Sequence, residues 1–435
     1  MFLSESLGLN EKGNLTIGGL DTVDLAEKYK TPLYVMDEEL IRKNCRLYLD
    51  SLKKAYGDNG LVLYASKAFS CIGVLKIAAQ EGMGLDVVSG GELYTAKKAG
   101  FPMDKVYFHG NNKTYDEIEF AVSENIGCFV ADNIGEICDI DEIASKNNKI
   151  VNILLRIKPG VDAHTHDFIK TGQIDSKFGF AIETGEAFDA VKKTLSCKSI
   201  NLLGIHCHIG SQIFEIEPFV EAAKVMLSFM KAVRDETGVE LSHLNLGGGY
   251  GVQYTKDDDP IGYDEYIGDI AKAVRKLAEK YQLKMPKIIM EPGRSIVASA
   301  GITLYKIGAV KEIPGIRTYV SVDGGMADNP RYIMYGAPYS AVVANKADQK
   351  ADRIVTIAGK CCESGDLIQE NIALANPEKG DVLAVLVTGA YNYSMSSNYN
   401  RIPKPAVVMI KDKKDRIIVK RESYEDVIRN DVSEE

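Results

Sequence analysis

Leu61-Val-Leu-Tyr-Ala-Ser-Lys67 is an apolar run that ends in a single lysine. Val62 and Tyr64 favour a β-strand, so Ser66 and Lys67 are expected at its carboxyl end. An amine that is partly removed from water at such a place loses its proton more easily and can attack a carbonyl group. An isolated strand-end lysine more often extends to water. The other strand ends decide between the two interpretations.

The same apolar pattern recurs along the chain, and helix-like segments such as 90–98, 115–124 and 218–237 separate the runs. Strands are expected over residues 61–65, 84–88, 105–109, 127–131, 151–157, 201–208, 243–246 and 287–291. Eight strand–helix alternations over roughly 250 residues predict an α/β fold, a (β/α)8 TIM barrel. A doubly wound sheet is the alternative, although it rarely needs eight units.

After residue 301 short β runs alternate with Gly, Pro and Asn turns. This pattern predicts a mostly antiparallel β-sandwich or β-barrel domain, which the N-terminal strand segment is expected to join. We therefore expect the TIM barrel over residues 37–300 and the β domain over residues 1–36 and 301–435. Asp37 is expected to cap a helix that runs to Leu52. The β runs lie at 304–310, 318–323, 353–358, 381–386, 406–410 and 416–420.

Composition narrows the class of protein. A chain of 435 residues is long enough for two domains. Its formal charge of −9 argues against nucleic acid or an anionic membrane as a partner. No apolar run is long enough to cross a bilayer, and the first residues lack the pattern of a secretory signal, so we expect a cytoplasmic protein. None of the eight cysteines forms a CxxC pair.

Polar residues stand where most of the predicted barrel strands end. In a TIM barrel the carboxyl ends of all strands face one cavity, which is where the chemistry takes place. The separate polar residues are therefore expected to form one constellation. They are Lys67, Asp86, Ser89, His109, Asp132, Arg156, His208, Gly247 to Gly249, and Glu291.

Two motifs at the last strand ends point to an anion site. Leu246-Gly-Gly-Gly-Tyr-Gly251 follows the seventh strand and Met290-Glu-Pro-Gly-Arg-Ser295 ends the eighth. Glycines let backbone N–H groups approach an anion, and phosphate sites recur after strands seven and eight of barrels. Alone, the glycine run is equally typical of a tight turn. Glu291 suits a protonated heterocyclic nitrogen, or an ion pair with Arg156 or Arg294.

Gly204-Ile-His-Cys-His-Ile-Gly-Ser-Gln212 keeps a different function open. His206 and His208 are two residues apart and lie on one face of a strand. Such a pair can bind a metal, with His109 and Asp132 as further ligands. A metal-dependent hydrolase is therefore an alternative, although the strand-end lysine and the glycine run suit it less well.

Together these motifs resemble the alanine-racemase-like enzymes that use pyridoxal 5'-phosphate, and within them the group IV diaminopimelate decarboxylase family. The resemblance covers nearly the whole chain, in the order of the family. The matching stretches are 64–68, Asp86-Val-Val-Ser-Gly-Gly-Glu92, 206–212, 247–251, Glu291-Pro-Gly-Arg294, Arg331-Tyr-Ile-Met-Tyr335, Cys362-Glu-Ser-Gly-Asp366 and Gly389-Ala-Tyr391.

The resemblance implies a role for each motif. Lys67 would bind the cofactor covalently, His208 would stack on its ring, and Glu291 would bond the ring nitrogen. Further cofactor-binding residues would be Asp86, Ser211, Gly248, Gly249, Gly293, Arg294 and Tyr391. The substrate would be bound by Arg294, Arg331, Tyr335, Glu363 and Tyr391.

The resemblance also implies how the catalytic site is completed. Cys362 would join Lys67 and His208 as a catalytic residue and would donate a proton. It would reach the site from the partner subunit of a head-to-tail homodimer. Residues 164–180 resemble the mobile active-site loop of the family.

The resemblance implies one reaction among several. Racemases of this superfamily place an arginine at the ring nitrogen, so Glu291 favours decarboxylation. Ornithine-type relatives carry an aspartate after the cysteine, so the pair Cys362 and Glu363 favours meso-2,6-diaminopimelate. The expected products are L-lysine and carbon dioxide, in the last step of lysine biosynthesis. The alternatives are decarboxylation of ornithine, arginine or carboxynorspermidine, or a pyridoxal-phosphate-binding regulator without catalysis.

Overall fold

A computed structural model describes residues 2–161 and 175–433. The chain consists of a barrel unit, residues 44–251 and 260–293, and a β unit, residues 1–43, 252–259 and 294–435. Among the helices of these described residues, none has the length and hydropathy needed to cross a membrane.

The barrel unit is a closed ring of parallel strands. The ring closes because β8 pairs with β9 and β13 pairs with β5. This closure confirms the predicted TIM barrel and excludes the doubly wound sheet. In ring order the strands are β5 (Gly60–Ala65), β6 (Gly84–Val87), β7 (Val106–Phe108), β8 (Cys128–Ala131), β9 (Val151–Lys158), β11 (Ile200–His206), β12 (His243–Asn245) and β13 (Lys287–Met290). A short strand, β10 (Phe180–Ala181), adds to β9.

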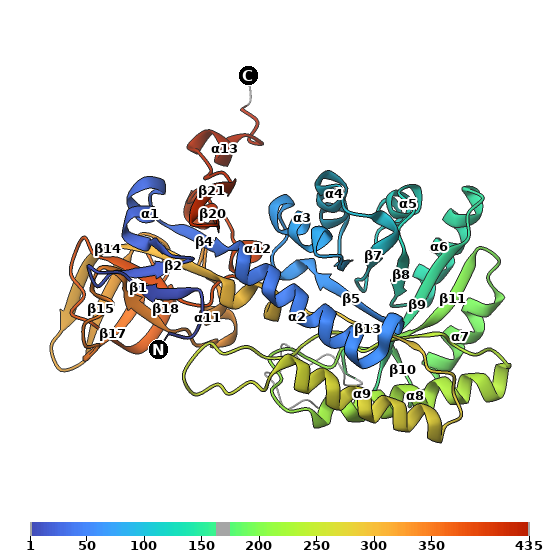
Figure 1. Ribbon diagram of the computed structural model, residues 1–435. Coiled ribbons are helices and arrows are strands. Elements are labelled where there is room, and N and C mark those ends of the chain that lie inside the picture. Colours follow the sequence, from blue (N-terminus) through green and yellow to red (C-terminus); the bar gives the residue numbers. More distant parts are fainter. Residues whose placement is uncertain (1, 162–174, 434–435) are drawn as a thin grey trace. The chain divides into compact units, whose positions relative to one another are not determined.

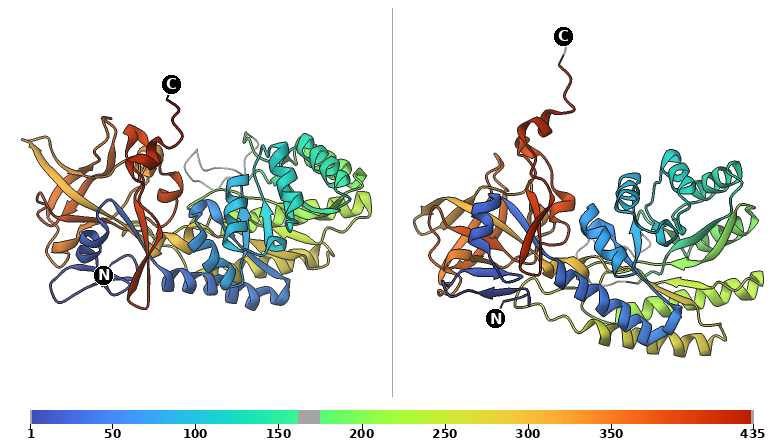
Figure 2. Two further views of the ribbon diagram at one scale, coloured as in Figure 1. Left: turned by 90° about the horizontal axis from the view of Figure 1, so that it is seen from above. Right: turned by 45° about the horizontal axis from the view of Figure 1, so that its top comes forward.

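Helices follow most of these strands and cover them. In Figure 1, α3 to α6 lie on one side of the strands and α8 and α9 lie on the other, and Figure 2 shows them from two further directions. In α9 the buried residues Tyr266, Ile267, Ile270 and Val274 recur three and four positions apart, which puts them on one face. The helices are α2 (Glu38–Tyr56), α3 (Ile72–Gln80), α4 (Gly90–Ala99), α5 (Tyr115–Ser123), α6 (Ile134–Lys146), α7 (Glu186–Ser196), α8 (Glu217–Thr237) and α9 (Tyr263–Lys280).

Apolar side chains from different strands fill the barrel. Leu63, Leu154 and Ile289 are fully buried and belong to one cluster with Tyr107 and Val130. These residues come from β5, β9, β13, β7 and β8. The strand runs predict this packing, because strands buried on both faces are apolar almost throughout.

The β unit is built around β14 (Gly301–Ile313), which pairs with β4 (Leu33–Asp37), β15 (Arg317–Val322) and β19 (Val382–Val385). The predicted N-terminal strand is thus confirmed as part of this domain. Most pairs are antiparallel, as predicted, but β15 with β17 and β20 with β4 are parallel. The remaining strands are β16 (Ala341–Val343), β17 (Arg353–Ala358), β18 (Leu367–Leu374), β20 (Ala406–Lys411) and β21 (Lys414–Val419).

Shorter elements complete the β unit. The small antiparallel sheet β1 (Leu7–Leu9), β2 (Leu15–Ile17) and β3 (Leu20–Asp21) precedes α1 (Thr22–Tyr29). Asp37 Oδ1 accepts from the backbone N of Glu39 at 2.9 Å, which confirms the predicted cap of α2. The short helices are α10 (Arg294–Val297), α11 (Arg331–Tyr335), α12 (Asn392–Met395) and α13 (Tyr424–Ile428).

Candidate active site

Backbone hydrogen bonds continue past the ends of the barrel strands. The N of Glu291 donates to the O of Gly247 at 2.8 Å, and the N of Ala65 donates to the O of Pro292 at 3.0 Å. The segments after β12, β13 and β5 are therefore joined by backbone hydrogen bonds that extend the barrel sheet beyond the strands. Side chains on these segments occupy fixed positions for this reason.

Lys67 lies directly after β5, in a short 3₁₀ helix, Ser66–Ala68. Ser66 and Ala68 are buried, whereas Lys67 is exposed. The turn ends the alternation of the strand, and the partial desolvation of the Lys67 amine stays a prediction.

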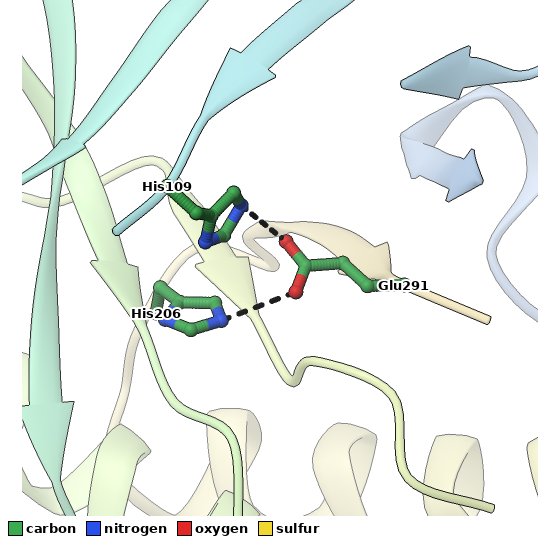
Figure 3. A group of neighbouring side chains, drawn as sticks. All are labelled: His109, His206 and Glu291. Carbon is green, nitrogen blue, oxygen red and sulfur yellow. Dashed lines mark hydrogen bonds and ion pairs between the residues drawn. The ribbon is translucent and has the colours of Figure 1, made fainter. Parts of the chain in front are cut away.

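Glu291, directly after β13, is the centre of a buried polar cluster. His206 ends β11, and its Nε2 lies 3.2 Å from Glu291 Oε2. His109 follows β7, and its Nε2 lies 2.8 Å from Glu291 Oε1. Figure 3 shows both imidazoles directed at the carboxylate from separate strands. Asn245 Nδ2, on β12, donates to Glu291 Oε1 at 2.6 Å.

The surroundings of Glu291 keep it ionised. Burial by itself would raise the pKa of this carboxyl, but the contacts with His109 and His206 outweigh burial and hold its pKa well below the usual range. Burial lowers the pKa of His206 to about 4. His206 is therefore neutral at physiological pH, and its Nε2–H is the donor, because an ionised carboxylate only accepts.

The partners of Glu291 differ from the ion pairs that the sequence allowed. Arg156 lies 3.8 Å from Asp132, and Arg294 donates to Tyr254 at 2.7 Å. Arg156 also interacts with Glu291 at longer range, since the charge of that carboxylate is among the causes that raise the pKa of the arginine. The carboxylate keeps its negative charge in a buried place.

The remaining polar strand-end residues surround this cluster. Asp86 is buried on β6, and burial is the main cause that raises its pKa, while His109 opposes it. His208, after β11, accepts from the N of Gly248 at 3.3 Å through Nδ1. Burial, then the charges of Lys67 and Arg156, lower the pKa of His208 well below its ordinary value. His208 is therefore a neutral ring that lies within the field of Lys67.

The glycine turn after β12 approaches other backbone segments closely. A Cβ at Gly248 would lie 2.1 Å from the O of Glu291, and one at Gly249 would lie 2.2 Å from the O of Gly210. Gly249 also has a φ of +105°, which side chains disfavour. A Cβ at Gly293 would lie 2.9 Å from the Cβ of Ala65. Glycine is required at these positions because neighbouring atoms approach too closely for a Cβ. The turn after β12 therefore presents backbone groups rather than side chains.

A second cluster lies in the β unit. Tyr254 is buried, and its ring faces the guanidinium groups of Arg294 and Arg331 at 5.7 and 5.0 Å. Arg331 also donates to Tyr339 Oη at 2.6 Å, and Arg294 lies over the ring of Tyr391 at 4.7 Å. Both buried arginines donate to tyrosine hydroxyl groups. Such a pair suits an anionic ligand.

Cys362 and Glu363 lie together on the loop between β17 and β18, and both are exposed. The N of Cys362 donates to Asn400 at 2.7 Å, and Glu363 Oε2 accepts from Tyr399 at 3.4 Å. Tyr335, at the end of α11, is half-buried. The side chains of this group are accessible in the described chain.

The structure groups the predicted site residues into two sets. The barrel unit holds Lys67, Asp86, His208, Ser211, Gly248, Gly249, Glu291 and Gly293, and the β unit holds Arg294, Arg331, Tyr335, Cys362, Glu363 and Tyr391. Most of the predicted loop 164–180 lies outside the described residues. In its described part, the N of Gly179 donates to Asp132 at 2.6 Å, and Arg156 lies over the ring of Phe178 at 4.1 Å.

The predicted metal-ligand set is not the one that the fold assembles. His206 joins His109 and Glu291, with ligand atoms within 4.8 Å of one another, whereas Asp132 bonds Gly179. Sequence reasoning also missed Asn245 and Tyr254. Asn245 had a signal, because it is a polar residue inside an apolar strand. Tyr254 had none, since it follows the glycine turn in a loop.

Comparisons with known proteins agree over nearly the whole chain. Residues 39–298 match the family described as "Pyridoxal-dependent decarboxylase, pyridoxal binding domain". The chain is 51% identical over 421 residues to the diaminopimelate decarboxylase of Bacillus methanolicus, with 97% of each chain covered. It is 49% identical to that of Bacillus subtilis, over 99% of this chain and 98% of the relative.

A solved structure is similar in both units. The diaminopimelate decarboxylase of M. jannaschii, in complex with L-lysine, matches with a TM-score of 0.91 and 38% identity, over 100% of this chain and 99% of that chain. These findings favour a pyridoxal-dependent decarboxylase over the metal-dependent hydrolase that the histidines also allowed.

Proposed function

Because this chain belongs to the family of pyridoxal-dependent decarboxylases, we propose that it decarboxylates meso-2,6-diaminopimelate at the D centre to L-lysine and carbon dioxide. The geometric observation that carries the proposal is the ionised Glu291, buried at the same strand ends as the amine of Lys67 and the glycine turn. The relatives named diaminopimelate decarboxylase match nearly full-length, so they support the activity as well as the fold.

The residues present fit the three reactive parts of pyridoxal 5'-phosphate. The aldehyde needs an accessible amine, and Lys67 is exposed at a strand end. The ring nitrogen needs an anion, and Glu291 is one. The phosphate needs hydrogen-bond donors, which backbone N–H groups without a covering side chain can supply. Residue 249 must be glycine, because a Cβ there would lie 2.2 Å from the O of Gly210.

Bound pyridoxal phosphate supplies an electron sink for the charge that decarboxylation leaves on the α-carbon. Glu291 would hold a proton on the ring nitrogen, which would deepen that sink. His208 is neutral, so it can stack on a protonated ring without repelling it. To Ser211, Gly248, Gly249, Gly293, Arg294 and Tyr391 we assign the cofactor phosphate and its surroundings, and to Asp86 a place beside the ring.

The β unit supplies the residues to which we assign the substrate. meso-Diaminopimelate carries both a carboxylate and an ammonium group at its far end. Arg331 and Arg294 suit the carboxylate, since a guanidinium group binds a carboxylate through two N–H groups. Glu363 suits the ammonium group and is accessible. We assign Tyr335 and Tyr391 to the same substrate.

Proton return to the α-carbon is assigned to Cys362, whose side chain is exposed. We propose that it acts in the site of a partner subunit, within a homodimer. We expect the cytoplasm as the compartment.

The activity is tested with purified protein, pyridoxal phosphate and the stereoisomers of diaminopimelate. Lysine should form from the meso isomer and not from the LL isomer, which has no D centre. Turnover of ornithine, arginine or carboxynorspermidine without lysine formation would move the function to a sister decarboxylase. Absence of turnover with all of these substrates would contradict decarboxylation altogether.

A further inference from the structure

Glu291 is held by groups from three other strands of the barrel. His109 follows β7, His206 ends β11 and Asn245 lies on β12. Their nitrogens lie 2.8, 3.2 and 2.6 Å from the carboxylate oxygens. All of these side chains are less than a tenth exposed, so the arrangement is part of the packed barrel.

The contacts are unequally divided between the two oxygens. Oε1 lies in the ion pair with His109 and accepts a hydrogen bond from Asn245, whereas Oε2 contacts only His206 among the described residues. An ionised carboxylate has about four acceptor positions. One position on Oε2 is therefore available for a further donor.

Two of these partners hold the carboxylate without cancelling its charge. His206 is neutral, because burial lowers its pKa to about 4. Asn245 is also neutral, and its Oδ1 accepts from the N of Gly247 at 2.9 Å, which fixes its orientation. A lysine or arginine in place of these donors would have paired with Glu291 fully. His206 and Asn245 therefore orient the Glu291 carboxylate, which is still able to attract a cation.

We propose that His109 and His206 are positioning residues, which clamp the Glu291 carboxylate so that its remaining acceptor faces the N–H of a heterocyclic ring. This inference rests on the proposed function, because the ring is that of pyridoxal phosphate. His109 and His206 touch Glu291 rather than the cofactor, so they act through its orientation.

The test compares two ligands that differ at one atom. Pyridoxal phosphate has a ring nitrogen, and 1-deazapyridoxal phosphate has a C–H in its place. Both are titrated into apoprotein, and the dissociation constants are measured from absorbance, without turnover. A hydrogen bond to a charged group is worth enough to make the wild type bind pyridoxal phosphate roughly tenfold more tightly than the deaza analogue.

Variants of the two histidines should change this ratio in a defined way. His109→Leu and His206→Leu each remove an imidazole that contacts the carboxylate, so they should bring the ratio close to one. His109→Gln and His206→Gln keep an amide N–H near the position of Nε2, so they should retain most of the ratio. His243→Gln is the matched control, because His243 is at the opposite end of β12 and bonds Ser242. A purely structural role would weaken both ligands equally and leave the ratio unchanged.

The outcomes separate the clamp from the proposed function. If the wild type binds neither ligand and makes no lysine, the proposed function fails. If the wild type discriminates but both leucine variants keep the full ratio, the clamp is wrong and the function stands. One zinc ion per chain, lost from both leucine variants, would also overturn the clamp, since the same groups lie close enough to share a metal.

Discussion

Tyr254 separates two buried cations in the β unit, where its ring faces Arg294 and Arg331. Burial would raise the pKa of this phenol, but the two arginines outweigh burial and lower its pKa. The Tyr254 hydroxyl group also accepts a hydrogen bond from Arg294 at 2.7 Å.

Tyr254→Phe should weaken substrate binding more than the chemical step. Phenylalanine keeps the ring but removes the acceptor for Arg294, which we assign to substrate and phosphate. Loss of one charge-assisted hydrogen bond predicts a roughly tenfold higher KM with a smaller change in kcat. Steady-state kinetics with meso-diaminopimelate measure both constants. Tyr332→Phe is the control, because Tyr332 bonds Glu370 instead. Unchanged KM in Tyr254→Phe would remove Tyr254 from the site.

Single residues show what a sequence can and cannot predict about a site. Glu291, Lys67 and the glycine run were identifiable, because their chemistry is unusual at strand ends. The 3₁₀ turn after β5 was not predicted, because residue types do not reveal it. Tyr254 was missed, because its role arises only when folding brings residues 254, 294 and 331 together.

Elements with regular apolar runs were predicted well. The eight barrel strands agree with their predicted positions because the predicted runs consist mainly of apolar residues. β18 (Leu367–Leu374) was missed, since Gln369, Glu370 and Asn371 interrupt its apolar pattern. Those polar residues have specific partners: Gln369 accepts from the N of Tyr339, and Glu370 accepts from Tyr332. Tertiary contacts therefore overrode a weak strand signal.

The first turn of α2 is fixed to β20 and β21 by one carboxylate. Glu38 is 2% exposed and bonds Arg42, Lys411 and Arg416 at 2.7 to 3.0 Å. Burial opposes its ionisation, but these cations together lower its pKa from 4.5 to about 2. Because the folded-state pKa is depressed, this stabilisation is present above pH 4.5 and is lost as the pH falls toward about 2.

Glu38→Gln should lower the free energy of unfolding by roughly 2–3 kcal/mol at neutral pH. The difference between variant and wild type should shrink once the pH falls below about 4.5. Urea unfolding at several pH values measures it, and Glu39→Gln serves as the control on the same turn, since Glu39 is exposed. A difference that does not depend on pH would show that charge is not its origin.

At the scale of the molecule, the chain carries its predicted chemistry in two units. The barrel unit holds the residues assigned to the cofactor ring, and the β unit holds those assigned to substrate and proton return. The assignment of these residues to a site stays a prediction from the sequence. The sequence alone does not show to which unit each residue belongs, because the boundaries between the units follow from packing rather than from local pattern.

Mixing two inactive variants tests the proposed shared site. Lys67→Ala removes the covalent attachment and Cys362→Ala removes the proton donor. If each active site of a homodimer uses Lys67 of one subunit and Cys362 of the other, an equal mixture should recover about a quarter of the wild-type activity. Activity is measured after joint refolding or co-expression. Recovery of no activity from a mixture that forms mixed dimers would contradict the shared site.

The most direct measurement is the position of the covalent link to the cofactor. The holoenzyme is reduced with borohydride, its absorbance is compared before and after, and the modified peptide is located by mass spectrometry. We predict one pyridoxyl group per chain, on Lys67, and none in Lys67→Ala under the same conditions. A pyridoxyl group on a different lysine, or none on the wild type, would contradict the account.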